Sequence, residues 1–185
     1  DSFQLEVIAG MINSCGFSEV LLFDVHSAIA TELIHHSVTI SNKVMVQAYQ
    51  EAGAVLICPD AGAARKIAQY QSWNTGITEM VYCEKKRDLT TGRLTLRVTE
   101  PERCTGKPCV IIDDICDGGA TFLAIAEQVN PSGLSLVVTH GIFSKGFAAL
   151  EKHFDEIICS NSLGQTYQHP LVKTIQPDWT NLKAD

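Results

Sequence analysis

The sequence predicts an α/β protein in which helices cover both faces of a mainly parallel sheet. Short apolar runs alternate along the chain with longer segments in which apolar residues recur at helical spacing. Glycine and proline residues separate many of these segments. Parallel strands need a crossover connection, which is usually a helix, so this alternation is typical of a parallel sheet that is buried on both faces.

Each predicted element has a local signal. Helices are expected at 2–13, 42–52, 61–71 and 121–129. Ser2 suits the N-cap of the first helix, Gly16 and Gly53 stop the first two, and Pro131 breaks the last. Strands are expected at 20–25, 55–58, 80–83, 109–112, 134–139, 156–159 and 171–175. Leu94, Leu96 and Val98 alternate with polar neighbours after a turn at 91–92, which predicts a hairpin or flap.

The composition is that of an ordinary globular chain. Its 185 residues are 45% hydrophobic and 19% charged, which argues against disorder. The net charge of −7 gives no basic footprint for nucleic acid, and no apolar stretch is long enough to span a membrane. The seven cysteines include no CxxC pair, so we interpret them as free thiols in a reducing cytosol and expect a cytoplasmic protein.

The segment from Val110 to Thr121 gives the clearest chemical signal. An apolar strand leads into two adjacent acids, Asp113 and Asp114, and a small-residue turn and a helix follow. Glycines let backbone amides approach a phosphate, the amino end of a helix adds partial positive charge, and carboxylates accept hydrogen bonds from ribose hydroxyls. An acid pair that merely caps a helix is the simpler interpretation, but the full combination is rarer. We therefore predict a loop that binds ribose 5-phosphate or its pyrophosphorylated form.

This loop resembles the phosphoribosyl pyrophosphate (PRPP) signature of proteins with the type I phosphoribosyltransferase fold. Four further segments resemble elements of the ribose-phosphate pyrophosphokinase family and occur in the family order. They are Asp-x-His at 24–26, a Pro-Asp element at 58–62, a basic element at 84–87 and Thr-His-Gly at 139–141. The resemblance covers nearly the whole chain. It implies a type I phosphoribosyltransferase-like sheet with a flap after the strand end at 84–87.

The resemblance also implies which residues bind ribose 5-phosphate. They are Asp113, Asp114, Asp117, Gly118, Gly119, Ala120 and Thr121. The two aspartates would bind the ribose hydroxyls, and residues 118–121 would hold the 5-phosphate. The family loop commonly reads Asp-Thr-Ala-Gly-Thr, so Gly118 removes a hydroxyl donor and Ala120 replaces a glycine, where it would hinder a positive φ. These departures bear on phosphate affinity rather than on the type of reaction.

Lys85, Arg87 and His26 are the expected catalytic residues. Pyrophosphoryl transfer moves dense negative charge, which mobile cations such as Lys85 and Arg87 would stabilise. The resemblance implies that His26 contacts ATP phosphates or Mg²⁺ and that Asp60 is a Mg²⁺ ligand, although Asp60 would equally suit a helix cap.

Three other side chains that could be mistaken for functional groups have simpler interpretations. Cys116 is interpreted as a packing residue whose pKa the neighbouring acids raise. His35 and His36 match no motif and are expected at the surface.

The leading hypothesis is a ribose-phosphate diphosphokinase that transfers pyrophosphate from Mg-ATP to ribose 5-phosphate, giving PRPP for nucleotide biosynthesis, and AMP. A base phosphoribosyltransferase that uses PRPP is the second hypothesis, but no segment suits a hood over the base. The third is a non-catalytic relative that regulates a partner enzyme. Family members usually complete the ATP site through subunit contacts, so a homo-oligomer is expected, with neither nucleic acid nor membrane as a partner.

Three segments are expected along the chain. Residues 1–38 would be the remainder of an N-terminal phosphoribosyltransferase-like domain whose upstream part is missing, because the chain starts without Met inside a predicted helix. Residues 39–160 would form the C-terminal phosphoribosyltransferase-like domain, and 161–185 a C-terminal segment.

Overall fold

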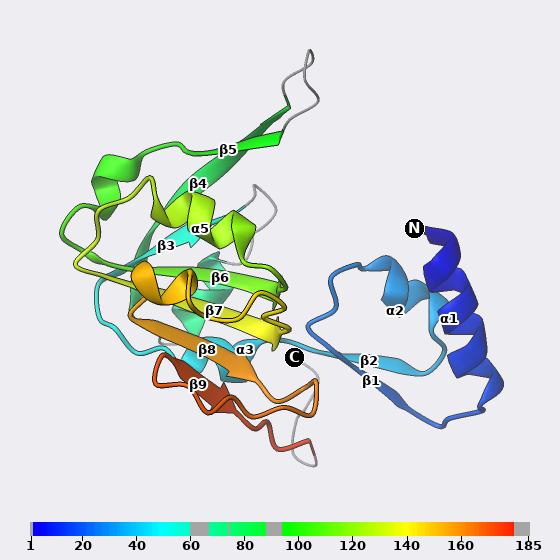
Figure 1. Cartoon of the computed structure of the whole chain (residues 1–185). Helices are drawn as coiled ribbons and strands as arrows, with labels where there is room; N and C mark the ends of the chain where they lie inside the picture. Colours follow the sequence, from blue (N-terminus) through cyan, green and yellow to red (C-terminus); the bar gives the residue numbers. More distant parts are fainter. Residues whose placement is uncertain (1, 60–66, 74, 88–93, 180–185) are drawn as a thin grey trace. The chain divides into compact units, whose positions relative to one another are not determined.

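The computed structural model of the chain describes residues 2–59, 67–73, 75–87 and 94–179. The chain divides into two compact units, which Figure 1 colours by sequence. The smaller unit comprises Asp1–Asn42 and Pro177–Asp185, and the larger comprises Lys43–Gln176. The assignment of chain segments to the domains of a longer protein stays a prediction.

The smaller unit has two helices and a two-stranded parallel sheet among its described residues. Its elements are α1 (Ser2–Ser14), β1 (Val20–Phe23), α2 (Ile29–Leu33) and β2 (Ser37–Ile40). Gly16, at a φ of +67°, follows the end of α1, as the sequence predicted. Asn13 joins α1 to the segment before β2, because its amide donates to Leu33 O at 2.9 Å and accepts from the His35 amide at 2.8 Å.

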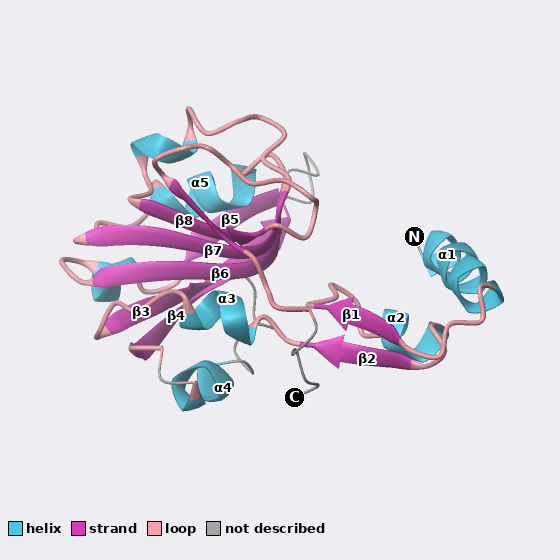
Figure 2. Cartoon of the chain, turned by 90° about the horizontal axis from the view of Figure 1, so that it is seen from below, coloured by secondary structure: helices cyan, strands magenta, loops and turns pink. Residues whose placement is uncertain are grey.

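The larger unit is built on a seven-stranded sheet in the order β5-β4-β3-β6-β7-β8-β9. Figure 2 draws its strands in magenta. Its strands are β3 (Ala54–Cys58), β4 (Ile77–Arg87), β5 (Leu94–Val98), β6 (Pro108–Cys116), β7 (Gly133–Gly141), β8 (Glu156–Ser160) and β9 (Val172–Ile175). Every pair is parallel except β4 with β5. The predicted parallel sheet is therefore confirmed.

Helices cover both faces of this sheet. They are α3 (Lys43–Gln47), α4 (Ile67–Ser72) and α5 (Ala120–Ala126), with 3₁₀ turns η2 (Pro101–Cys104) and η3 (Leu150–Lys152). α5 buries Phe122 and Ile125 in a large apolar cluster on one face. α3 buries Met45 and Val46 and contacts β7 and β8, and neither residue belongs to the α5 cluster. The two helices therefore cover opposite faces, as predicted.

Two strands are longer than their apolar runs predicted. β4 extends to Arg87 because β5 pairs with it antiparallel, from Cys83 opposite Val98 to Arg87 opposite Leu94. The basic element at 84–87 therefore lies inside a strand ribbon and not after a strand end, which corrects the expectation. Both strands of the predicted hairpin are present, while its turn at 91–92 lies outside the described residues.

β6 is extended in the same way by its neighbour. β7 pairs with it as far as Cys116 opposite Gly141, so Asp113 and Asp114 lie inside β6 and not beyond it. Backbone pairing of β6 thus continues through polar residues for which the apolar pattern predicted a loop. α1 is the longest described helix, at 13 residues. No helix in the described ranges is long and apolar enough to cross a membrane.

Candidate functional site

The two acids lie at the carboxyl end of β6, where open parallel sheets bind their ligands. Asp113 and Asp114 are both half-buried, and the Asp114 amide donates to Asp113 Oδ1 at 3.0 Å. The next two residues differ sharply, because Ile115 is 43% exposed while Cys116 is fully buried. The acid pair is therefore held by strand pairing on a rigid element, with solvent within reach.

Gly119 forms the turn between β6 and α5. Its φ of +75° is in the left-handed region, and its carbonyl accepts the Leu123 amide at 3.0 Å. A Cβ at this position would lie 3.1 Å from Leu150 Cδ2, so glycine is favoured by both backbone and space. The positive φ falls at Gly119 and not at Ala120, so the helix accommodates Ala120 without the strain expected from the sequence.

Ala120 and Thr121 are exposed in the first turn of α5. The first amides of a helix have no acceptor within the helix itself. Backbone amides therefore accompany the Thr121 hydroxyl as hydrogen-bond donors beside the turn. This arrangement is what phosphate binding by the loop requires.

The segment after β7 packs on this turn and was not found from the sequence. The amides of Ile142 and Phe143 donate to Cys116 O at 2.8 and 3.1 Å, and the Ser144 amide donates to Asp117 O at 3.2 Å. Phe143 is buried and stacks edge-on with Tyr167, whose hydroxyl donates to Gly141 O at 2.7 Å. The only sequence signal for this support was the motif at 139–141 just before it.

That Thr-His-Gly motif lies at the end of β7, beside the acids. His140 is in register with Ile115 of β6, and its Nδ1 lies 2.8 Å from Ser162 Oγ. The Thr139 carbonyl accepts the Ser160 hydroxyl at 2.6 Å, which joins the ends of β7 and β8. The structure therefore brings this motif together with the predicted sugar loop.

Burial, and secondarily the nearby Asp117 and Asp113, raises the pKa of the Cys116 thiol to about 12. The thiol is thus protonated near neutral pH and is no nucleophile. The interpretation of Cys116 as a packing residue is confirmed.

The ribbon of β4 and β5, which carries the basic element at 84–87, extends from the edge of the sheet at which the acid pair lies. β4, β3 and β6 are parallel neighbours, so their carboxyl ends share one edge. Lys85 is exposed and pairs with Leu96, and Arg87 pairs with Leu94 at the end of the ribbon. Asp60 follows β3 by two positions in sequence and lies outside the described residues.

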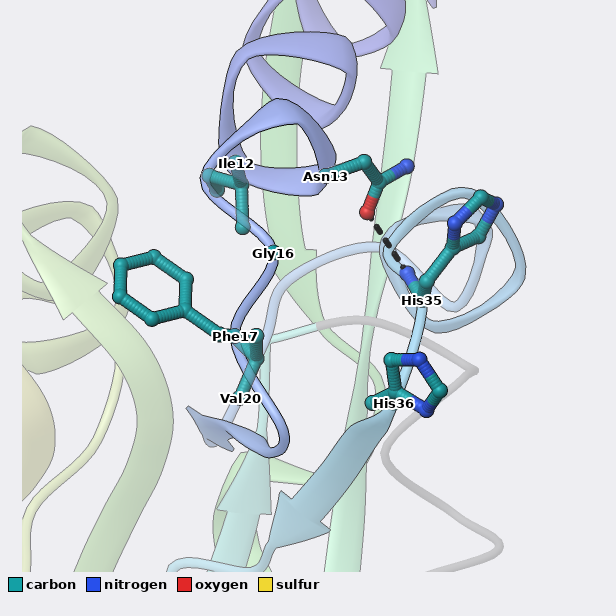
Figure 3. Close-up of a pocket in the computed structure, with 7 residues that line it drawn as sticks. All are labelled: Ile12, Asn13, Gly16, Phe17, Val20, His35 and His36. Carbon is teal, nitrogen blue, oxygen red and sulfur yellow. Dashed lines mark hydrogen bonds between the residues drawn. The ribbon is translucent and has the colours of Figure 1, made fainter.

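The predicted site residue of the smaller unit is His26, which follows β1. Asp24, at a φ of +44°, is buried there, and its amide donates to Ile40 O at 2.8 Å. A separate small hollow of about 110 Å³ lies in this unit. Figure 3 draws the residues that line it. His35 and His36 line it and are both exposed, as the sequence predicted.

No group of three or more His, Cys, Asp or Glu residues that could hold a metal ion occurs within the described ranges. The predicted Mg²⁺ ligand Asp60 is outside those ranges, so its role stays a prediction.

Sheet order, crossover helices and the acidic loop together define a protein with the type I phosphoribosyltransferase fold. No protein-family model matches the chain. Its sequence is 24% identical over 172 residues to ribose-phosphate pyrophosphokinase 2 of Saccharomyces cerevisiae, covering 85% of this chain and 52% of the yeast protein. It is 27% identical over 163 residues to the ribose-phosphate pyrophosphokinase of Ureaplasma parvum, covering 82% of this chain and 47% of that protein. The chain is thus related to the ribose-phosphate pyrophosphokinase family, as its motifs predicted.

A solved structure has the same fold. The phosphoribosylpyrophosphate synthetase from Mycobacterium smegmatis superimposes with a TM-score of 0.77 at 19% identity, over 94% of this chain and 59% of that one. The chain spans about half the length of the curated relatives that it matches.

Proposed function

We propose that the protein is a ribose-phosphate diphosphokinase, which transfers pyrophosphate from Mg-ATP to ribose 5-phosphate and releases AMP and PRPP. The proposal rests on the carboxyl end of β6, where two carboxylates, a left-handed glycine and the first turn of α5 follow one another. The names of the curated relatives, which are pyrophosphokinases, support it.

In this proposal the loop binds the sugar phosphate through two kinds of group. Asp113 and Asp114 accept hydrogen bonds from the ribose hydroxyls, since ionised carboxylates are pure acceptors. The turn at 117–119 and the exposed start of α5, with Ala120 and Thr121, provide amide and hydroxyl donors for the 5-phosphate. Strand β6 and the segment after β7 hold both groups in place before the substrate arrives.

The reaction forms one bond and breaks one. The C1 hydroxyl oxygen of ribose 5-phosphate attacks the β-phosphorus of ATP, and the bond from that phosphorus to the oxygen bridging the α-phosphate breaks. AMP leaves with that oxygen, and the hydroxyl proton passes to solvent. Lys85 and Arg87 on the β4–β5 ribbon stabilise the charge on the transferred group, and the rest of the catalysis is alignment.

Magnesium would be held by Asp60 together with substrate phosphates, and the role of His26 stays the separate prediction made from the resemblance. The carboxylate fits this ion, which keeps several waters and uses one or two carboxylates beside phosphate oxygens. When bound, the ion would offset the charge of the ATP phosphates.

AMP release tests the proposal. The protein, with any residues that its gene encodes before Asp1, is mixed with Mg²⁺, ATP and ribose 5-phosphate. AMP should form only when ribose 5-phosphate is present. Lys85→Ala should lower the rate by roughly two to three orders of magnitude, as the loss of a group that stabilises transition-state charge does elsewhere. Asp113→Ala removes acceptors for the ribose hydroxyls and should lower kcat/KM by roughly tenfold or more. Lys152→Ala, at an exposed lysine in η3, is the matched control and should keep the rate.

Two results would replace the proposal with another function. No AMP from a folded protein that binds ribose 5-phosphate would favour the non-catalytic relative. Consumption of PRPP with a nitrogenous base and release of pyrophosphate would identify a base phosphoribosyltransferase.

A further inference from the structure

A lysine outside the predicted site lies against the phosphate loop, by which we mean residues 117–121. Lys145 belongs to the segment after β7, whose amides at Ile142, Phe143 and Ser144 donate to the carbonyls of residues 116 and 117. Buried Phe143 fixes this segment from below by packing on Phe147 and Tyr167. The Lys145 backbone is therefore held beside the loop by the fold itself.

The side chain of Lys145 passes directly over Gly118. A Cβ built at Gly118 would lie 3.3 Å from Lys145 Cε, 3.4 Å from Cδ and 3.7 Å from Cγ, and these carbons are its three nearest neighbours. Gly118 has no left-handed φ, so its backbone conformation does not require glycine. Glycine leaves the lysine stem in place, because a Cβ would require the stem to shift by a few tenths of an ångström.

The ammonium of Lys145 is one covalent bond beyond Cε, so the stem brings a positive charge to the phosphate turn. Lys145 is exposed, and within the described ranges no ion pair or hydrogen bond occupies its ammonium. Lysines commonly bind phosphate as a point charge, and a charge-assisted hydrogen bond is about twice as strong as a neutral one.

We propose that Lys145 binds the 5-phosphate of ribose 5-phosphate, and that Gly118 is the residue that admits it. The proposal rests on the proposed function, which identifies the ligand of the loop. The ammonium supplies a hydrogen-bond donor in place of the threonine hydroxyl that the family loop commonly has where this chain has Gly118. Gly118 and Lys145 therefore act as a pair. Removing the charge of Lys145 weakens phosphate binding, and so does adding a side chain at residue 118.

The charge of Lys145 is tested by binding. Ribose 5-phosphate, ribose, inorganic phosphate and ATP are each titrated into the protein and into Lys145→Met, which keeps the stem and removes the charge. Ribose 5-phosphate and inorganic phosphate should bind roughly tenfold or more weakly, as expected for the loss of a hydrogen bond to a charged group, while ribose and ATP bind unchanged. Lys145→Arg should keep most of the affinity, and Lys152→Met, in η3, is the control.

Equal affinity of Lys145→Met for ribose 5-phosphate would overturn the proposal, provided that circular dichroism shows a folded variant. A larger loss for ATP than for ribose 5-phosphate would also overturn it, because the ammonium would then serve the nucleotide. Binding needs no turnover, so weaker phosphate binding in a protein that makes no AMP would sink the proposed function and leave Lys145 as a phosphate ligand.

The pairing is tested by a double substitution. Gly118→Thr places a side chain where the Lys145 stem lies, so it should weaken ribose 5-phosphate binding when Lys145 is present. In the Lys145→Ala background the threonine has room and adds a hydroxyl donor, so the same substitution should improve binding at least twofold. Effects of the two substitutions that simply add would contradict the pairing.

Discussion

Gly119 joins β6 to α5 with a backbone that other residues adopt only at a cost. Gly119→Ala should lower the free energy of unfolding by about 1–2 kcal/mol for the left-handed φ, and by more because of the contact with Leu150. Gly146→Ala is the matched control, since Gly146 has a φ of +67° and nothing within 4 Å of an added Cβ. Urea unfolding measures both, and an equal loss in the two variants would contradict a role for Leu150.

Cys116 should be inert although it lies between acids of the predicted site. Its raised pKa, about 12, leaves almost no thiolate at neutral pH, and thiolate becomes common only as the pH approaches that value. Iodoacetamide at neutral pH should modify exposed Cys15 and leave Cys116 unmodified, as mass spectrometry would show. Urea-unfolded protein is the control in which both react. Modification of native Cys116 at the rate of Cys15 would contradict this account.

Buried Tyr49 and half-buried Tyr167 should respond in opposite ways to loss of the hydroxyl. The Tyr49 hydroxyl has no hydrogen-bond partner within the described ranges, so Tyr49→Phe should leave the free energy of unfolding unchanged or raise it by up to about 1 kcal/mol. Tyr167→Phe loses the bond to Gly141 O and should lower it by about 1 kcal/mol. Urea unfolding compares them, and destabilisation of both variants would show that Tyr49 has a partner.

At the scale of elements, apolar runs predicted where strands have their cores but not where they end. Residues 80–83 and 109–112 were found, yet β4 and β6 continue because β5 and β7 offer backbone partners beyond the apolar stretch. α2 and β2 were missed because each is very short, at five and four residues. Tertiary pairing decides such ends, and one sequence does not reveal it.

An ion-pair cluster ties β4 to the entry of β6. Lys107 Nζ lies 2.6 Å from Glu79 Oε1 and Arg103 lies 3.2 Å from Oε2, and these two partners, Lys107 first, hold the pKa of Glu79 below its ordinary 4.5. A carboxyl group whose pKa is lowered by folding stabilises the folded state at pH values above its unfolded-state pKa. This stabilisation is lost as the pH falls through the folded-state pKa. Glu79→Gln should therefore be less stable than the wild type at neutral pH.

The difference in the free energy of unfolding between the wild type and Glu79→Gln should shrink as the pH falls below about 4.5, because the wild-type carboxyl is then protonated. Urea unfolding of both proteins across this pH range tests this prediction. A difference that stays constant with pH would show that the charge of Glu79 is not what stabilises this corner.

For the whole molecule, the sequence predicted the fold class and the loop because both rest on local patterns. Asp113, Gly119 and Thr121 follow one another along the chain, so their arrangement was visible without coordinates. Phe143 and Lys145 were not, because they reach the loop from another segment through tertiary packing. Tyr167 was not either, because it supports that segment from further along the chain. Their own sequence context gives no motif that links them to a phosphate.

In the proposed reaction, pyrophosphate moves as one unit from ATP to ribose 5-phosphate. ³¹P NMR of the protein with Mg²⁺, ATP and ribose 5-phosphate follows every phosphorus atom in the reaction. The ATP resonances should give way to those of PRPP and AMP in equal amounts, with no inorganic phosphate. Unchanged ATP beside bound ribose 5-phosphate, or the appearance of ADP and phosphate, would contradict it.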